Sequence, residues 1–478
     1  MNFKRKLWWA QHRTDVYKYG TILSLVLIVT ISIIYFTYSK FTSKNEMTAY
    51  ETTVEPFIKN DYFIASYIDG EWSNEIPGKN DGYAVDKIVC DNGATGTWDN
   101  EEWGINIRNA TKKIKCGVYF KKLVKLTEQI TTLASTDTTN FATDDPDNNI
   151  RYIGKDPNNY IYFNCSDYSN QTDDTCEKWR IIGLFKNVTK EDGTKENLVK
   201  IISNDDKEVL ERMFWDSKPS GRGTSKNGFG SNDWTDSQAM IMLNPAEYLK
   251  SGYSINDSGE ILDTNSKKIF QGMGAYYNGT AGYSRCYYMG VVSPSNPNPP
   301  YICREIDFTT SGLKNDITRN TIESVKWALG GLDSSSNLPQ AFYEAERNNN
   351  VYTDHADNWI GKIGLMYPSD YGYATGGGDT KSRSECLASN LYDYHETDCW
   401  RNNYLKKTWH QWTLTPVSTS NTEVFYINSI TGSVSRYEAG NDMMPHTAWL
   451  RPTIYFKQSV LIDRGDGSST NPYQLSVQ

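Results

Sequence analysis

The chain has 478 residues, of which 38% are hydrophobic, 22% charged and 13% aromatic, and its formal net charge is −9. These proportions exclude a disordered chain, a collagen and a polytopic membrane protein, and the length allows two or three domains. An isoelectric point near 5.3 argues against a nucleic-acid partner, because a nucleic-acid footprint needs concentrated Lys and Arg. The unusual counts are 33 Tyr and 8 Cys.

The charge is unevenly distributed along the chain. Residues 1–18 hold five basic side chains and one acidic one, which leaves 44 basic and 57 acidic side chains, a net charge of −13, in the rest. Residues 21–38 (TILSLVLIVTISIIYFTY) then form an uncharged apolar run. A helix of that length nearly crosses a hydrocarbon core of roughly 30 Å. The pattern predicts a basic cytoplasmic segment over residues 1–18 and a transmembrane signal anchor over residues 19–40, with the lipid bilayer as a partner and the bulk of the chain extracellular.

Three other interpretations of this apolar run are weaker. A cleavable signal peptide would end in an A-x-A-like site, whereas residues 39–43 read SKFTS. A prepilin leader resembles the Lys18-Tyr19-Gly20 step, but the pilin family has Glu where this chain has Leu25. A buried core helix would carry a polar face, and this run has none.

The eight cysteines all follow the apolar run and fall into four local couples. The separations within the couples are 26, 11, 17 and 13 residues. An even number of locally paired cysteines is typical of disulfides in an oxidising compartment, and no Cys-x-x-Cys spacing supports zinc. The alternative is reduced cysteines scattered in the core. We therefore expect the disulfides Cys90–Cys116, Cys165–Cys176, Cys286–Cys303 and Cys386–Cys399.

Between the expected anchor and residue 149, the sequence predicts a stalk, a small β module and a linker. Residues 41–56 are short and polar, as in a stalk. Residues 57–122 predict a small β module, because alternating stretches at 62–68, 83–90, 103–107 and 113–120 are separated by turn pairs such as Asp69-Gly70. Residues 123–149 predict a helix, at 123–134, and a polar linker. Three aspartates of this linker are either solvated or calcium ligands: Asp144, Asp145 and Asp147.

Residues 150–478 predict one large β-rich α+β domain. Strands are expected at 160–164, 179–185 and 198–202, and again at 363–367, 409–414, 424–428, 432–436 and 448–456. Helices are expected at 236–249, where Asp236 is the N-cap and Pro245 splits the helix, at 316–329, which Gly330-Gly331 ends, and at 338–347.

Several motifs near the C-terminus resemble a known group of proteins. They are residues 412–416 (WTLTP), 424–428 (VFYIN), 432–434 (GSV), 449–455 (WLRPTIY), 465–467 (GDG) and 471–473 (NPY). Their order resembles that in uncharacterised extracellular domains of bacterial surface proteins, which are distantly similar to the C-type-lectin-like fold of the formylglycine-generating-enzyme superfamily. The resemblance covers residues 160–475 and implies a C-type-lectin-like fold for residues 150–478. Residues 88–120 resemble a small disulfide module that precedes such domains.

The residues give little support for catalysis. The formylglycine-generating family uses a closely spaced cysteine pair as copper ligands, whereas Cys386 and Cys399 lie farther apart, so that activity is not transferred to this chain. Four histidines follow the anchor, namely His355, His395, His410 and His446, and no spacing assembles them into a site. We name no catalytic residue. The enzymatic alternative is an exported glycan-acting hydrolase with paired carboxylates about 5 to 10 Å apart in a cleft.

Recognition or adhesion at a cell surface is the favoured function, with an unknown extracellular protein or glycan as partner. Aromatic side chains crowd the expected loops and give five candidate ligand-binding residues: Tyr371, Tyr373, Tyr392, Tyr394 and Trp400. The alternative is that they fill the core. No cofactor is expected, except that calcium is possible at Asp370, Asp379, Asp393 and Asp398. A third function is a structural subunit of a pilus-like assembly, which predicts an exposed apolar patch or a strand-accepting edge.

Overall fold

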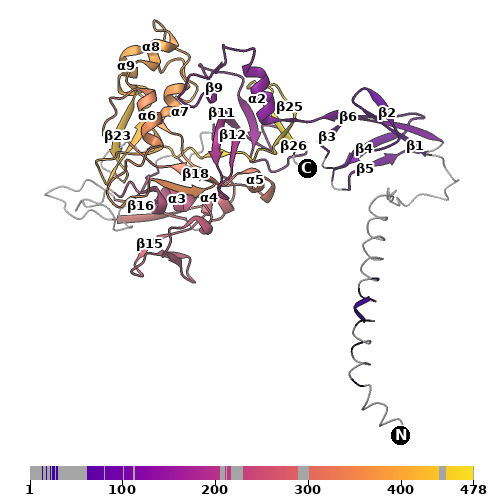
Figure 1. The fold of residues 1–478 in the computed structure, drawn as a ribbon, viewed down its shortest axis with the longest axis horizontal. Helices are drawn as coiled ribbons and strands as arrows, with labels where there is room; N and C mark the ends of the chain where they lie inside the picture. Colours follow the sequence, from indigo (N-terminus) through magenta and orange to yellow (C-terminus); the bar gives the residue numbers. More distant parts are fainter. Residues whose placement is uncertain are drawn as a thin grey trace, which may run out of the picture. The chain divides into compact units, whose positions relative to one another are not determined.

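A computed structural model describes residues 62–476, apart from 80, 101, 111–112, 205–209, 211–212, 217–229, 282, 289–300 and 441–447, together with a few helical residues between 13 and 30. For residues 283–288 and 301–304 only the backbone is described. The chain divides into two compact units, Met1–Lys121 (unit 1) and Lys122–Gln478 (unit 2). Strands predominate in both units (Figure 1).

The membrane anchor expected over residues 19–40 is not supported by the structure. Within the described part of the chain, no helix has the length and apolar character needed to cross a bilayer. Of the predicted segment only isolated helical residues are described, among them the exposed Ile22, Leu25, Val26 and Ile28, and the remainder lies outside the described residues, as does the stalk at 41–56. A transmembrane helix requires about 20 consecutive apolar residues. The predicted anchor, and the single-pass localisation derived from it, are therefore contradicted by the described residues.

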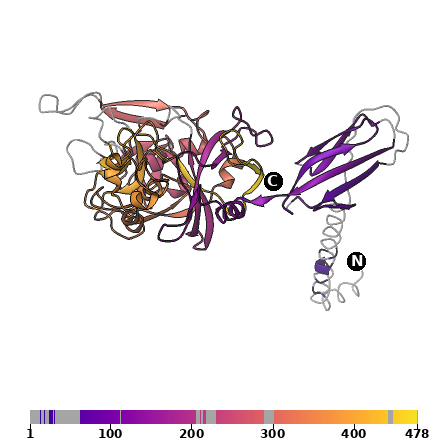
Figure 2. The same ribbon diagram turned by 90° about the horizontal axis from the view of Figure 1, so that it is seen from above.

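Unit 1 is a four-stranded sheet covered on one face by a hairpin. The sheet has the order β2-β1-β6-β3, with β1 Tyr62–Ile68, β2 Glu71–Ser73, β3 Tyr83–Cys90 and β6 Ile114–Lys122, and β1 runs parallel to β6 (Figure 2). The covering hairpin is β4 Thr95–Asp99 and β5 Gly104–Arg108. Its Trp98 ring meets Phe120 of β6 edge-on at 5.4 Å. Alternate residues of β6 therefore point into a small core under the hairpin.

The predicted Cys90–Cys116 disulfide is present and lies in this small core. It joins β3 to β6, and Cys116 is buried beside Ile114. Gly96 of β4 allows the hairpin to approach, because a Cβ at this position would lie 2.5 Å from Ile88 of β3. The disulfide and the hairpin thus occupy the same face of the sheet.

Unit 2 is built on a seven-stranded sheet. Its path is β20-β24-β12-β11-β9-β8, and β10 pairs with β11. The strands are β8 Phe141–Ala142, β9 Ile150–Tyr152, β10 Tyr160–Phe163, β11 Glu177–Thr189, β12 Lys195–Ser203, β20 Ile363–Gly364 and β24 Thr453–Tyr455. The long β11–β12 hairpin is its centre, with Trp179 opposite Ser203 and Thr189 opposite Lys195.

Smaller sheets and short helices surround this sheet. The sheets are β13 Ser254–Ile255 with β14 Glu260–Leu262 and β15 Lys268–Gln271, β16 Tyr283–Tyr288 with β17 Tyr301–Ile306, β18 Val325–Ala328 with β19 Asn358–Gly361, β21 Gln411–Pro416 with β22 Glu423–Ile427 and β23 Val434–Glu438, and β7 Val124–Lys125 with β25 Leu461–Arg464 and β26 Gln474–Ser476. The α-helices are α2 Leu126–Ala134, α3 Gln238–Leu243, α4 Ala275–Asn278, α5 Asp316–Thr321, α6 Pro339–Glu346, α7 Pro368–Tyr373, α8 Arg383–Leu387 and α9 Tyr394–Thr397.

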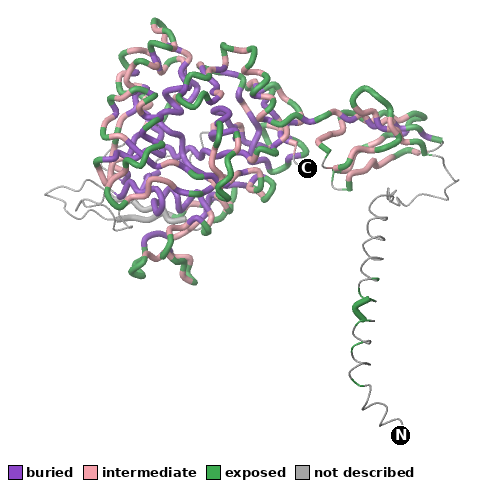
Figure 3. Tube along the Cα trace, in the orientation of Figure 1, coloured by how far each residue is buried: buried purple, intermediate pink, exposed green. Residues whose placement is uncertain are grey.

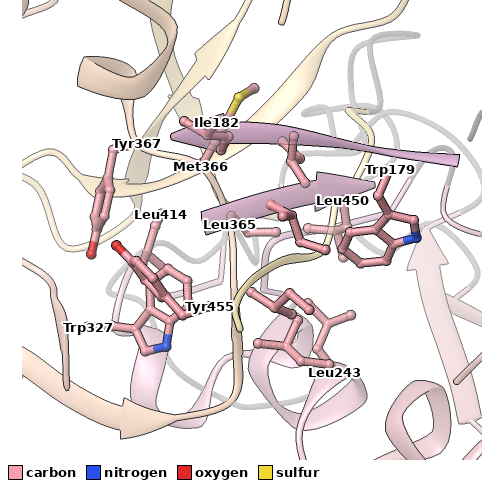
Figure 4. Packing of buried hydrophobic residues seen from close by; sticks show 14 of the residues in the cluster. Trp179, Ile182, Leu243, Trp327, Leu365, Met366, Tyr367, Leu414, Leu450 and Tyr455 are labelled. Atoms are coloured by element: carbon pink, nitrogen blue, oxygen red, sulfur yellow. The ribbon is translucent and has the colours of Figure 1, made fainter. Parts of the chain in front are cut away.

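Buried residues are concentrated in the interior of unit 2, as the colouring of the Cα trace shows (Figure 3). In one part of this core Trp327, Tyr367 and Tyr455 lie side by side, and the Trp327 and Tyr455 ring centroids are 5.2 Å apart (Figure 4). Leu243, Leu365 and Leu450 are fully buried in the same cluster. Aromatic residues therefore contribute much of the core.

Two further cystine predictions are confirmed in unit 2. Cys165–Cys176 and Cys386–Cys399 are both disulfide-bonded. The backbone of β16 and β17 places Cys286 directly opposite Cys303, while their side chains lie outside the described residues.

The helix expected at 316–329 is wrong beyond its first turns. Helix α5 ends at Thr321, and Val325–Ala328 is strand β18, paired with β19. The β-branched and aromatic side chains of this segment fit a strand, and pairing with β19 overrides the helical spacing. The helix at 236–249 begins at the N-cap Ser237 rather than Asp236, and it breaks before Pro245 as expected.

We expect that replacing both cysteines of unit 1 (C90A/C116A) lowers its free energy of unfolding by about 3 kcal/mol, because the bond closes a loop of 26 residues. Hydrogen exchange of the full chain, read by mass spectrometry, would show faster exchange in peptides from residues 62–121. The matched variant C386A/C399A should leave those peptides unchanged. Equal protection of residues 62–121 in wild type and C90A/C116A would contradict the expectation.

Candidate functional site

Three aromatic residues lie side by side on β2, β1 and β6 at the open face of the unit 1 sheet, and their rings form a triangle of mutual contacts. Tyr67 of β1 lies directly opposite Trp72 of β2 on one side and Tyr119 of β6 on the other. The ring centroids are 5.1 Å apart for Tyr67–Trp72, 5.2 Å for Tyr67–Tyr119 and 5.3 Å for Trp72–Tyr119. We call Tyr67, Trp72 and Tyr119 the aromatic row. Trp72 is 56% exposed although it is a large apolar side chain.

Local sequence features set this geometry. Asp69 and Gly70, with φ of 51° and 92°, form the two-residue turn that returns β2 against β1 and brings Trp72 opposite Tyr67. Positive φ at both positions suits Asp-Gly and matches the right-handed twist of a hairpin. Gly117 of β6 leaves space for the indole, since a Cβ there would lie 2.8 Å from Cη2 of Trp72.

Charged side chains border the row. The Lys87 ammonium lies 4.6 Å from the centre of the Tyr119 ring, a cation–π distance. The row and its border enclose an open hollow of about 460 Å³, lined by Tyr67, Trp72, Asp86, Lys87, Tyr119, Phe120 and Lys121. Asp86 is the one carboxylate among the described residues of this lining. The hollow combines exposed rings with a few hydrogen-bonding groups, as small-ligand sites do.

The four tyrosines and one tryptophan expected to bind ligand are not gathered on a surface. Tyr371, Tyr373 and Tyr394 are buried, and the Tyr371 hydroxyl donates a hydrogen bond to the carbonyl of Gly432. These three fill the core, which was the alternative interpretation. Tyr392 is exposed, and Trp400 is half-buried under the ammonium of Lys406, 4.6 Å away.

The four aspartates proposed for calcium have other partners. Asp379 and Asp398 both pair with Arg401, at 2.9 and 3.0 Å, and Asp393 accepts a hydrogen bond from Asn390. Asp370 is fully buried between two cations. Across the described residues, no group of three or more His, Cys, Asp or Glu side chains is placed to share a metal ion. Calcium binding therefore gains no support from this geometry.

The three aspartates of the expected linker also have partners. Asp144 pairs with Arg383 at 2.8 Å, and Asp147 accepts a hydrogen bond from the Tyr343 hydroxyl. Asp145 is buried and pairs with Arg151 at 2.6 Å.

The described histidines make contacts typical of structural residues. His410 is buried and its Nδ1 accepts a hydrogen bond from the backbone N–H of Ser429. His395 Nδ1 lies 3.1 Å from the Ser433 hydroxyl. The His355 ring packs against that of Tyr352 at a tilt of 57°, and His446 lies outside the described residues.

A buried cluster of charges lies inside unit 2. Arg151 of β9 and Lys200 of β12 both register against Gly183 of β11, where a Cβ would lie 2.2 Å from the carbonyl oxygen of Ile150. Asp370 of α7 enters this space and accepts from Lys200 at 2.5 Å and from Arg151 at 3.0 Å. These two cations hold the pKa of Asp370 near 2 despite its burial.

Glu346 of α6 adds a second buried carboxylate near this cluster. It accepts hydrogen bonds from the backbone N–H and the hydroxyl of Ser369, and its Oε2 lies 3.2 Å from the Arg347 guanidinium. Burial raises the pKa of Glu346 to about 7, and the Arg347 charge and the Ser369 hydrogen bonds only partly oppose this rise.

Comparison with protein-family models, with curated proteins and with solved structures found no match to this chain.

Because of Glu346, the free energy of unfolding should fall as the pH rises from 4.5 to 7. In the folded state it keeps its proton up to about pH 7, whereas in the unfolded chain it ionises near its ordinary pKa of 4.5. Its stabilising contribution is fully present below pH 4.5 and is lost as pH rises to 7, a loss of roughly 3 kcal/mol. Glu346→Gln should remove this decline in urea unfolding at a series of pH values. The exposed Glu344→Gln on the same helix should keep it, and parallel declines in wild type and Glu346→Gln would disprove the assignment.

Proposed function

We propose that the protein is an extracytoplasmic recognition protein that binds a glycan through the aromatic row of unit 1. The observation that carries the proposal is the exposed Trp72, held by Tyr67 and Tyr119 at the open face of the sheet. Exposure of a large apolar ring to water carries a cost, so the exposed Trp72 packed against the partly buried Tyr67 and Tyr119 marks a site of interaction. The three disulfides found among the described residues support an oxidising compartment.

The chemistry of the hollow favours a sugar over other ligands. Aromatic faces provide large apolar contact at low entropic cost, which suits the C–H face of a pyranose ring. The Lys87 ammonium at the border is then placed to hydrogen-bond the hydroxyl groups that project from the ring edge.

The hollow argues against hydrolysis of that glycan. Glycosidases use two carboxylates that flank the bond to be cleaved. Among the described residues of the lining, Asp86 is the one carboxylate, and Lys87 follows it directly. We therefore assign binding without bond cleavage to this site.

The role of Trp72 can be tested by binding measurements. A glycan array with the full chain should identify bound structures, and Trp72→Ala should weaken binding of the best one by about tenfold or more, since truncation of a central aromatic anchor commonly removes that much affinity. Trp409→Ala is the matched control, because Trp409 is 41% exposed but lies in unit 2. Loss of affinity in Trp409→Ala with full binding in Trp72→Ala would move the site to unit 2. Failure to bind any glycan, together with capture of a protein partner or measurable hydrolysis, would refute the proposal.

A second variant perturbs the row without removing a ring. Gly117→Ala places a methyl group 2.8 Å from Cη2 and 3.1 Å from Cζ3 of Trp72, so the indole must shift. We expect weaker glycan binding than in wild type, with a smaller loss than in Trp72→Ala. Gly104→Ala is the control, because its nearest neighbour is 4.0 Å away. Wild-type affinity in Gly117→Ala would show that the position of Trp72 is unimportant.

A further inference from the structure

Lys200 and Asp370 form a fully buried ion pair within the charge cluster of unit 2. They are 170 residues apart in the chain, and Nζ of Lys200 lies 2.5 Å from Oδ2 of Asp370. Both side chains are 0% exposed. Lys200 lies on β12, between β24 and β11, and Asp370 lies in the first turn of α7. The amine and the carboxyl group are therefore held together away from water.

Aromatic rings enclose the amine. Nζ of Lys200 lies 4.3 Å from the Tyr367 ring centroid, 5.3 Å from that of Phe185, and 5.5 Å from those of both Trp327 and Tyr455. Trp327, Tyr367 and Tyr455 are seen together in Figure 4. Burial lowers the pKa of Lys200 to about 8, because an apolar surrounding disfavours the charged ammonium. A fraction of the Lys200 amine is thus neutral and nucleophilic near neutral pH.

Two further donors hold the carboxyl group. Arg151 Nη1 donates to Oδ1 of Asp370 at 3.0 Å, and the backbone N–H of Tyr367 donates to Oδ2 at 3.0 Å. The Arg151 guanidinium is fixed on its other side by Asp145, at 2.6 Å. A fixed cation on Oδ1 is placed where negative charge would develop if a nucleophile added to the carboxyl carbon.

We propose that Lys200 and Asp370 become joined by an intramolecular amide bond between Nζ and Cγ. A proton first crosses the 2.5 Å contact from Nζ to Oδ2, which leaves an amine beside a carboxylic acid. The amine then adds to Cγ, and negative charge develops on Oδ1 beside Arg151. The C–Oδ2 bond breaks, and Oδ2 leaves as water with its proton and one from nitrogen. The ammonium and the carboxylate thus become one neutral amide and one water molecule, without oxidation or reduction.

The buried setting favours the amide over the ion pair. Two buried charges carry a large desolvation cost, and the amide removes both of them. Arg151 keeps Asp145 as its counter-ion, so no buried charge is left unpaired by the reaction. The bond would tie β12 permanently to α7, and this consequence is independent of the proposed glycan binding.

Mass spectrometry of the full chain tests the bond directly. After reduction and denaturation, the wild-type chain should be lighter than its sequence mass by one water molecule, and a tryptic digest should contain the Lys200 peptide joined to the Asp370 peptide. Lys200→Met should restore the sequence mass. Asp370→Asn should lose one ammonia instead of one water, because the leaving group is then nitrogen.

A matched ion pair serves as the control. Lys178 and Asp173 are 2.9 Å apart but lie at the surface, with side chains 26% and 67% exposed. Lys178→Met should retain both the mass deficit and the branched peptide. Separate, unbranched Lys200 and Asp370 peptides in the wild-type digest would overturn the proposal, whatever the variants show.

Discussion

A strand in a two-layer module can bury only one of its two faces, and this constraint shapes unit 1. Ile114, Cys116 and Val118 of β6 point under the covering hairpin, where the disulfide also lies. The intervening Gly117 and Tyr119 must then face the other way. The pairing that buries the cystine therefore presents the aromatic row on the opposite side of the sheet.

A different constraint organises unit 2, where charges are buried at the centre of the fold. Asp370 connects β9 through Arg151 and β12 through Lys200, so one carboxylate joins three elements that are distant in sequence. Gly183 permits the close approach of β9, because a Cβ at this position would lie 2.2 Å from the carbonyl oxygen of Ile150. A buried ion pair contributes little net stability, but removing one partner is costly, so the cluster favours one arrangement of these elements. Conversion of the Lys200–Asp370 contact into an amide would make that arrangement permanent.

The sequence predicted features set by short-range constraints. Cysteine spacing correctly paired Cys90 with Cys116 and two further couples, because short loops close easily. The turn at Asp69-Gly70 could also be predicted, since an Asp-Gly pair by itself favours a tight turn. The helix predicted at 316–329 failed where Val325 pairs with Gly361, a contact that local spacing does not reveal.

The site itself depends on long-range register, which explains why it was missed. Trp72 meets Tyr119 only because β1 and β6 pair in parallel, and no local signal specifies that pairing. The sequence also did not decide whether the tyrosines near Cys386 and Cys399 bind a ligand or fill the core. In the structure Tyr371 and Tyr394 are buried. One overlooked signal was available: Lys200 interrupts the apolar run Leu198–Ile202, and a charge within a buried strand requires a partner.

The most direct measurement of the central claim is hydroxyl-radical footprinting of the full chain with and without a saturating glycan ligand. Oxidation reports the solvent exposure of individual aromatic side chains, and Trp72 and Trp409 are both exposed in the free protein. The account predicts that the glycan protects Trp72, together with Tyr67 and Tyr119, and leaves Trp409 as reactive as before. Protection confined to unit 2, with Trp72 unchanged, would contradict it.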